Sequence, residues 1–397
     1  MRLLAIHPVP YLLAYGGLCV AQRAMFEGLA SLGHQVTVVT TASPPSSSIE
    51  SEIVSEDGDT ERRSRAGVDI RVLLRVERFL DRAAMAKTFR DLRAEVGPDV
   101  YVSAEDVVAT AHGGPEFGFW TSILADVAPP SSIVYCAHSA GAFPLGVHSA
   151  NGGAEHAACF SALGAIITVS QQLRRYIREL VPTRTEVFAF PVYGAGPFPD
   201  LSDFSRGSVG MINPSGIKGL PIFLEAARAL PHRRFIAVPA WASTDEVQNR
   251  LRSLPNIEIV KPMADRNELY GSFSALLVPS LWMEAFGMVV VEAMLRGIPV
   301  LASDYGGLPE AKLGVPYLLP ISPLEILQKG QDFANMPMPA QDVRPWVNAI
   351  EALLSDPVHY ARISAQGRET SARFVAGATM APFIDLLREV AANAAIG

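Results

Sequence analysis

The sequence has few cysteines and no long apolar run, and each shortage excludes a class of protein. Its three cysteines, Cys19, Cys136 and Cys159, lie far apart without a C-x-x-C pair, which predicts reduced thiols and no cysteine metal site. No apolar run approaches the roughly 20 residues that span a bilayer. The apolar first six residues are stopped by a His-Pro pair, too early for a signal-peptide core. We therefore expect a cytoplasmic protein that is not integral to a membrane.

Charged residues are also scarce, and their balance limits the partners. Of the 397 residues, 18% are charged and 49% are hydrophobic, a composition that indicates a folded globular chain. The length exceeds what one core usually supports, so two domains are expected. The net charge of −7 argues against a nucleic-acid binder that relies on a globally basic surface.

Strand and helix patterns alternate almost throughout, which favours an α/β fold with parallel sheets covered by helices. The expected strands are 3–6, 36–39, 100–103, 133–136, 165–169, 208–212, 235–238, 257–260, 275–278 and 299–302. Residues 43–65 are interpreted as a mobile surface loop. A segment rich in glycine, proline and aspartate, 194–205, is placed at the domain linker. We predict two Rossmann-like domains that face a cleft, 1–192 and 193–377, with a C-terminal helix at about 378–397 completing the first.

The most informative stretch is 283–293, in which Glu284 and Glu292 flank a Phe-Gly turn and the start of an apolar helix. If this stretch is mostly helical, the two glutamates lie roughly 12 Å apart along the axis. Unpaired amides at the helix start, around Gly287, attract phosphates with the help of the helix dipole. The stretch therefore predicts a site for a nucleotide sugar.

Three other candidates each follow an expected strand. Gly16 and Gly17 form either a phosphate-approaching turn or a tight turn that only needs glycine. His138 is either a hydrogen-bonding site residue or a satisfied structural histidine. Lys218 stands at a helix start, where the dipole disfavours a cation, so it indicates a nearby anion or a solvated side chain.

The order and spacing of these elements resemble the family 4 retaining glycosyltransferases of the GT-B fold. The similarity is strongest over 278–280, 284–287, 291–294, 297–300 and 306–310. The Gly16-Gly17 turn, the helix end and strand start at 29–36, the element at 169–170 and the Lys218-Gly219 pair agree with the family in order.

The resemblance implies a catalytic group of Glu284, Lys218 and His138. Glu284 would contact the donor sugar, Lys218 would neutralise charge on the leaving nucleotide, and His138 would lie beside the sugar. Stabilisation of a leaving group by a fixed cation is a large contribution to catalysis.

The resemblance also implies how the donor is held. Glu292 would bind the ribose, and Gly16 and Gly17 would lie against the diphosphate. The other donor contacts would come from Asn213, Lys218 and the backbone amides of Phe286, Gly287 and Met288.

Two positions depart from the family. Asn213 stands where the family usually carries an arginine, five residues before the lysine, so the positive charge at the diphosphate is reduced. The usual Asn-Gly turn at the linker is replaced by residues 192–196.

Weaker signals are kept apart from the site. The D-x-D pattern at 57–59 has no preceding apolar strand and is interpreted as a solvated loop. His7 occupies a place where inverting enzymes of this fold carry a base. The basic stretch from Arg71 to Arg93 is interpreted as a solvated helix face, with a weak peripheral membrane contact as the alternative.

The sequence thus predicts a retaining hexosyltransferase that uses a UDP- or GDP-sugar and an acceptor hydroxyl, without a metal or other cofactor. The acceptor is expected to be a sugar, a lipid-linked molecule or a small molecule, and no nucleic acid is expected. The location would be cytoplasmic, with peripheral association at the inner face of the membrane if the basic stretch binds lipid. Two alternatives stay open: a nucleotide-sugar-binding partner protein that has lost catalysis, and an inverting enzyme that uses His7.

Overall fold

The chain forms two compact units. The computed structural model describes residues 1–14, 16–43, 48–75, 80–105, 107–109, 115–149, 153–240, 243–263, 265–325 and 336–395. Unit 1 comprises Met1–Gly194 and the returning segment Ala378–Gly397, and unit 2 takes the described residues between Ala195 and Gly377. The division lies two residues from the boundary expected at 192, and the return begins at the expected residue 378.

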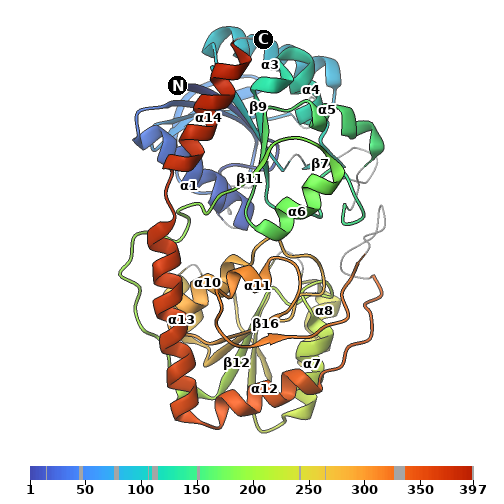
Figure 1. Cartoon of the computed structure of the whole chain (residues 1–397), viewed down its shortest axis with the longest axis vertical. Coiled ribbons are helices and arrows are strands. Elements are labelled where there is room, and N and C mark those ends of the chain that lie inside the picture. The colour runs from blue at the N-terminus through green and yellow to red at the C-terminus, as the bar shows by residue number, and fades with distance from the viewer. Residues whose placement is uncertain are drawn as a thin grey trace. The chain divides into compact units, whose positions relative to one another are not determined.

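Within its described residues, unit 1 is built on one nine-stranded sheet (Figure 1). Its strands, in spatial order, are β11 (Thr185–Val187), β10 (Ala165–Thr168), β9 (Ile133–Ala137), β6 (Val100–Ala104), β1 (Arg2–His7), β2 (Gln35–Thr41), β5 (Val68–Leu73), β4 (Thr60–Arg65) and β3 (Glu52–Asp57). The first seven pair in parallel, and β6 and β9 are buried at every residue. This continuous burial explains why all their residues except Ser103 are apolar or aromatic, because helices cover both faces of a parallel sheet.

Unit 1 also contains helices among its described residues. They are α1 (Gly17–Ser31), α3 (Arg82–Val96), α4 (Phe119–Val127), α5 (Ala157–Ser161), α6 (Gln171–Leu180) and α14 (Ala381–Ala394), with short 3₁₀ turns η2 (Pro130–Ser132) and η3 (Ala154–His156). A small hairpin pairs β7 (Val107–Ala109) with β8 (Pro115–Phe117). Phe383 and Leu387 of α14 belong to the core of unit 1, so the last helix of the chain completes this unit.

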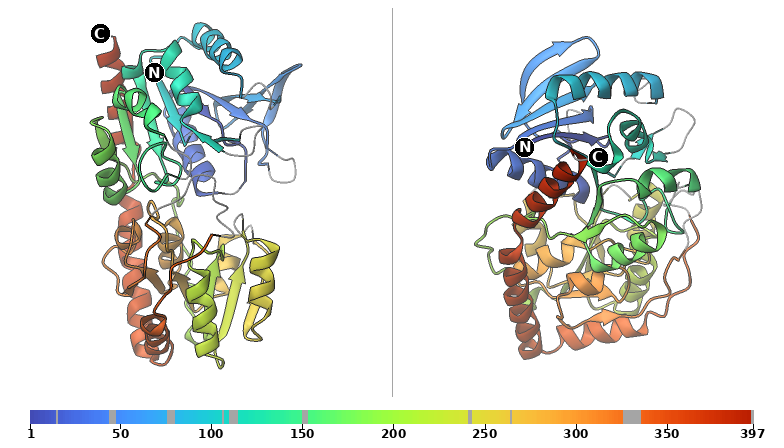
Figure 2. Two further views of the ribbon diagram at one scale, coloured as in Figure 1. Left: turned by 90° about the vertical axis from the view of Figure 1, so that its right-hand side faces the viewer. Right: turned by 45° about the horizontal axis from the view of Figure 1, so that its top comes forward.

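The prediction of a loop over 43–65 is wrong for residues 52–57 and 60–65, whereas the described residues 49–51 lie in no helix or strand. Residues 52–65 form the antiparallel strands β3 and β4, which extend the sheet beyond β5 (Figure 2). Every residue of β3 is exposed, so its polar residues leave no alternation between apolar and polar positions. Residues 44–47 lie outside the described residues. The D-x-D pattern falls at the β3–β4 turn, where Asp59 forms an ion pair with Arg75.

The basic stretch is not one helix. Arg71 lies in β5, residues 76–79 fall outside the described part, and α3 begins at Arg82 after the N-cap Asp81. Several cations there have acidic partners: Arg71 pairs with Asp69 and Glu95, Arg82 with Asp126, and Lys87 with Asp91. The charge available to an anionic surface is reduced accordingly.

Unit 2 contains a six-stranded parallel sheet within the described residues. The spatial order is β14 (Ile257–Ile259), β13 (Arg234–Val238), β12 (Ser208–Ile212), β15 (Ala275–Val278), β16 (Val300–Ser303) and β17 (Leu318–Leu319). Its helices are α7 (Leu220–Ala229), α8 (Asp245–Arg252), α9 (Arg266–Gly271), α10 (Met288–Leu295), α11 (Leu308–Ala311), α12 (Arg344–Leu354) and α13 (Pro357–Gly377), with the 3₁₀ turn η4 (Phe204–Arg206). No helix in the described parts of the chain is long and apolar enough to cross a membrane.

The core of unit 2 includes the helical positions that the sequence pattern indicates near its end. Trp346, Ile350, Leu353 and Leu354 of α12 are all buried in it. The indole Nε1 of Trp346 donates a hydrogen bond to the carbonyl of Pro320, 3.2 Å away, so burial leaves the polar atom satisfied.

We expect Trp346→Ala to lower the free energy of unfolding by roughly 3–5 kcal/mol, because it leaves a large cavity in a packed core. Urea unfolding followed by circular dichroism measures the change. Val358→Ala, at a side chain that is 77% exposed, is the matched control and should have little effect. A loss of less than about 1 kcal/mol for Trp346→Ala would contradict this account of the core.

Candidate functional site

The candidate residues of unit 2 gather where the order of its strands reverses. From β12 the chain passes through α7 to β13 on one side, whereas β15 pairs with β12 on the other. Loops that leave neighbouring parallel strands on either side of such a point diverge and form a binding crevice at their carboxyl ends. Lys218 follows β12, and Glu284 follows β15.

Lys218 and Glu284 are in direct contact there. The Lys218 Nζ lies 2.5 Å from Glu284 Oε1, and the same oxygen accepts a hydrogen bond of 2.7 Å from the Ser280 hydroxyl. The ammonium also lies over the ring of Trp282, 4.6 Å from its centroid. Burial acts to raise the pKa of Glu284, but the charge of Lys218 and hydrogen bonds from Lys218, Trp282 and Ser280 hold this pKa below its usual value. The glutamate is therefore an ionised hydrogen-bond acceptor.

Two glycines allow the surrounding loops to approach this pair. A Cβ on Gly219 would lie 1.9 Å from the carbonyl oxygen of Pro279, and one on Gly307 would lie 2.2 Å from that of Ala285. Between the loops, the amide of Leu281 donates to the carbonyl of Ile217, and the amide of Gly307 to that of Glu284. Backbone contact thus fixes the loops after β12, β15 and β16 in one arrangement.

The helix that follows Glu284 is shorter than the spacing argument assumed. Helix α10 begins only at Met288, with Gly287 as its N-cap, so residues 284–287 are not helical and the distance of roughly 12 Å along a helix axis does not apply. No side chain caps α10, and its first amides have no carbonyl within the helix to bind. The ring of Phe286 stacks on Phe374 of α13 at 5.6 Å, which leaves its backbone amide as its contribution to the site.

Glu292 lies in the second turn of α10, buried and already engaged. Its Oε2 accepts a hydrogen bond of 2.7 Å from the Tyr270 hydroxyl, and its Oε1 pairs with the guanidinium of Arg266. Arg296, the C-cap residue of α10, donates to the carbonyl of Glu292 and to the side-chain oxygen of Asn267. Helices α9 and α10 are therefore tied together around this carboxylate.

Asn213 follows β12 in the left-handed backbone conformation, with φ of 57°. Its backbone amide donates a hydrogen bond of 2.8 Å to the carbonyl of Val238, and the residue is buried. Asparagine adopts this conformation more readily than an arginine does, because its short side chain bonds locally. The local backbone is thus a physical reason for asparagine where an arginine was expected.

In unit 1 the candidate residues lie around the start of α1. Gly16 is the N-cap of α1, and Gly17 is its first residue. The side-chain amide of Gln22, on the same helix, lies within hydrogen-bond distance of His138, with 2.5 Å between the two Nε2 atoms. Burial lowers the pKa of His138 to about 3, so this ring is neutral near pH 7.

A buried carboxyl group accompanies His138. Strands β1, β6 and β9 are parallel neighbours, so His7, Glu105 and His138 lie at one edge of the sheet. Glu105 accepts a hydrogen bond from the backbone of His138, yet burial dominates and raises the pKa of Glu105 to about 8. Burial also lowers the pKa of His7 to about 4. Within the described chain, Glu105 Oε1, Gln22 Oε1 and His7 Nε2 are buried without a hydrogen-bond partner.

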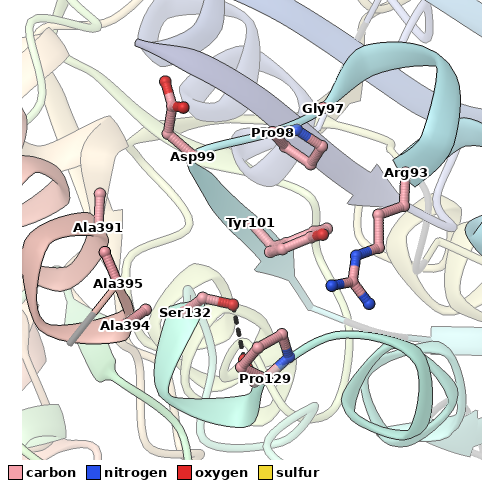
Figure 3. Close-up of a pocket in the computed structure, with 10 residues that line it drawn as sticks. All are labelled: Arg93, Gly97, Pro98, Asp99, Tyr101, Pro129, Ser132, Ala391, Ala394 and Ala395. Carbon is pink, nitrogen blue, oxygen red and sulfur yellow. Dashed lines mark hydrogen bonds between the residues drawn. The ribbon is translucent and has the colours of Figure 1, made fainter. Parts of the chain in front are cut away.

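A separate hollow of unit 1 lies away from these residues. It has a volume of about 330 Å³ and is lined by Arg93, Asp99, Tyr101, Ser132 and the end of α14 (Figure 3). Asp99 and Tyr101 stand at the start of β6, whereas Glu105 follows its end. The hollow is therefore at the opposite edge of the sheet, and none of the predicted site residues lines it.

Sequence reasoning did not single out several residues of the site. Ser280 lies in the matched stretch 278–280 and Glu105 directly follows a strand, so a search for polar residues after strands finds both. Trp282 lies between two matched stretches and is not found by such a search. Gln22, Tyr270 and Arg266 leave no such signal, because they meet their partners only in the folded units. Across the described residues, no group of three or more histidine, cysteine, aspartate or glutamate side chains is arranged to hold a metal ion.

We expect Glu105 to make stability depend on pH. Its folded pKa of about 8 exceeds the ordinary 4.5, so between these values the folded protein holds a proton that the unfolded chain releases. Its contribution to stability is present below pH 4.5 and is lost as pH rises through 8.

The stability difference between wild type and Glu105→Gln should therefore shift with pH. We expect the wild type to lose up to about 1.4 kcal/mol per pH unit relative to the variant between pH 5.5 and 7.5. Urea unfolding at several pH values measures this, with the exposed Glu52→Gln as control. A difference between wild type and Glu105→Gln that stays constant across the range would refute the assignment.

Comparisons with known proteins identify the family to which the two units are similar. The family model described as glycosyl transferase 4-like domain matches residues 16–192, and that described as glycosyl transferases group 1 matches 205–356. Among curated relatives, D-inositol 3-phosphate glycosyltransferase of Corynebacterium glutamicum is 24% identical over 217 residues, 54% of this chain and 46% of that protein. An exopolysaccharide phosphotransferase of Streptomyces coelicolor is 26% identical over 175 residues, 41% of this chain and 16% of that protein. The chain thus spans less than half the length of these relatives.

Solved structures show the same fold. Anabaena HepE, crystallised with UDP-glucose, superposes with a TM-score of 0.62 at 17% identity and full coverage of both chains. A glycosyltransferase of Rickettsia africae gives a TM-score of 0.62 at 13% identity, with 98% of each chain covered. The two family matches together span most of the chain. This protein therefore has the GT-B fold of two Rossmann-like domains and belongs to the group 1 glycosyltransferases, with an N-terminal domain of the glycosyl transferase 4-like family.

Proposed function

We propose that the protein transfers a hexose-type sugar from a UDP- or GDP-sugar to an acceptor hydroxyl, with retention at the anomeric carbon. The observation that carries the proposal is the Lys218–Glu284 contact at the reversal point of the unit 2 sheet, beside the uncapped start of α10. A cation, an ionised acceptor and free backbone donors in one place suit the two ends of a sugar diphosphate.

The donor would lie with its diphosphate at α10 and its sugar toward Glu284. The amides of Phe286, Gly287 and Met288 would donate to phosphate oxygens, as uncapped helix starts do. The ionised Glu284 would accept hydrogen bonds from sugar hydroxyls. Glu292, in the second turn of α10, would accept from the ribose hydroxyls, and Gly16 and Gly17 would supply amides from unit 1.

In the transfer, the bond from the anomeric carbon to the diphosphate oxygen breaks, and a bond from that carbon to the acceptor oxygen forms. The nucleoside diphosphate leaves with the electron pair of the broken bond, and its departing oxygen would take the proton that the acceptor hydroxyl loses. Lys218 would stabilise the charge that develops on this leaving group. His138, neutral because of its burial, would form a hydrogen bond with a sugar hydroxyl. These roles require no metal, and we propose metal-independent transfer.

The chemical identity of the donor and of the acceptor is proposed from the names of similar proteins. HepE is described in complex with UDP-glucose, which makes UDP-glucose the first donor to test. The curated relatives named for D-inositol 3-phosphate suggest a small polyol acceptor, and a lipid-linked acceptor follows if residues 71–93 touch a membrane. The ion pairs of Arg71, Arg82 and Lys87 make the solvated interpretation of that stretch the better supported.

The two alternatives differ in what the protein does to its donor. A partner protein that only binds nucleotide sugars is favoured by Asn213, which brings no charge to the diphosphate, but it leaves the Lys218–Glu284 pair without a purpose. An inverting enzyme needs His7 as a base. Burial lowers the pKa of His7 to about 4, which weakens its affinity for a proton and disfavours this role.

We expect Lys218→Ala to lower turnover of the accepted donor by roughly 10²–10³-fold, since it removes the cation at the leaving group. Release of UDP or GDP from a panel of nucleotide sugars, with and without lipid acceptors, measures turnover. Arg228→Ala, an exposed cation on α7, is the matched control. Wild-type protein that binds a donor but never turns it over would support the partner protein, and an inverted product would support the His7 mechanism.

We expect Glu292→Ala to weaken binding of UDP or GDP at least about tenfold, because it removes a charged acceptor of ribose hydrogen bonds. Isothermal titration with each nucleotide measures the affinity. Exposed Glu258→Ala, on β14, should leave it unchanged. Equal affinities for Glu292→Ala and the wild type would remove the ribose assignment.

A further inference from the structure

The carboxylate of Glu292 has a partner that the sequence does not indicate. Its Oε1 pairs with Arg266, the first residue of α9, whereas its Oε2 is held by the Tyr270 hydroxyl. The glutamate side chain is only 8% exposed, but that of Arg266 is 41% exposed. The carboxylate is thus the buried member of the pair, and the guanidinium lies between the carboxylate and solvent.

The position of Arg266 is set by the end of its helix. Asp265 caps α9 by accepting a hydrogen bond from the backbone amide of Asn267, and the side chain of Asn267 accepts one from Arg296, the C-cap residue of α10. Tyr270 ties the other end of α9 to Glu292. Arg266 therefore projects from a short helix that is anchored to α10 at two places.

A guanidinium has five N–H donors in a planar fork, and the pair with Glu292 uses only part of them. The remaining donors lie beside a carboxylate that can still accept hydrogen bonds, since each carboxylate oxygen has two acceptor positions and only one of them is taken, by Arg266 or by Tyr270. A vicinal diol matches this arrangement, because its hydroxyl hydrogens can go to the carboxylate while its oxygens accept from the guanidinium.

We propose that Arg266 is a specificity-determining residue for the ribose of the donor nucleotide, acting together with Glu292 on the 2′- and 3′-hydroxyls. The proposal rests on the assignment of Glu292 to the ribose in the proposed function and adds a residue to it. A ribonucleotide diphosphate then gains hydrogen bonds that a deoxyribonucleotide cannot form. Arginine is required rather than any cation, because lysine lacks the planar fork.

The test compares UDP with 2′-deoxy-UDP by isothermal titration of the full chain. We expect the wild type to prefer UDP by about tenfold, the value of a hydrogen bond to charged groups. Arg266→Gln should weaken UDP binding by a similar factor while changing 2′-deoxy-UDP much less, so that the preference falls toward one. Arg266→Lys should not restore the preference. Arg250→Gln, an exposed arginine of α8, is the matched control and should retain it.

The other outcomes overturn the proposal. Equal loss of affinity for both nucleotides in Arg266→Gln would mean a general charge or a structural role, and tighter UDP binding would mean that the ion pair competes with the ligand. If the wild type prefers UDP and Arg266→Gln retains that preference, the role of Arg266 is refuted while the proposed function stands. A wild type that binds neither UDP nor GDP would overturn the proposed function as well. Circular dichroism of each variant, with Arg266→Lys as the milder change, confirms that the chain is folded.

Discussion

The close approach of three backbone loops is the constraint on which the unit 2 site depends. Gly219 and Gly307 lie so near the carbonyls of Pro279 and Ala285 that a Cβ at either position would overlap them. With the loops after β12, β15 and β16 in contact, Lys218 meets Glu284, and Trp282 lies against the ammonium. A site with a fixed cation and a fixed carboxylate requires little reorganisation when charge develops on a ligand.

The two units hold their polar groups in different ways. In unit 2, both glutamates have cationic partners, Lys218 for Glu284 and Arg266 for Glu292, so each buried carboxylate is compensated. In unit 1, burial without such partners keeps His7 and His138 neutral and raises the pKa of Glu105. Unit 2 thus offers charges that suit a nucleotide diphosphate, and unit 1 offers neutral hydrogen-bonding groups that suit hydroxyls.

Much of the fold was accessible from the sequence because buried parallel strands have continuous apolar runs. The expected strands at 208–212 and 275–278 have the bounds found in the structure, and the others differ by one or two residues at an end. The hairpin of β3 and β4 was taken for a loop, because exposed strands at the edge of a sheet carry polar residues on both faces. Their pairing with β5 makes them strands, and no local pattern encodes that pairing.

The sequence by itself determined the class of the fold, the approximate domain boundary and the identity of Lys218, Glu284 and Glu292 as candidates, because glycine turns, apolar strands and helix starts are local signals. Only the tertiary structure decided which groups meet. Arg266 lies 26 residues before Glu292, and Gln22 lies 116 residues before His138. The presence of asparagine at position 213 is likewise explained only by the left-handed backbone conformation after β12. Such contacts depend on how strands are ordered in a sheet, which the spacing of residues along the chain does not specify.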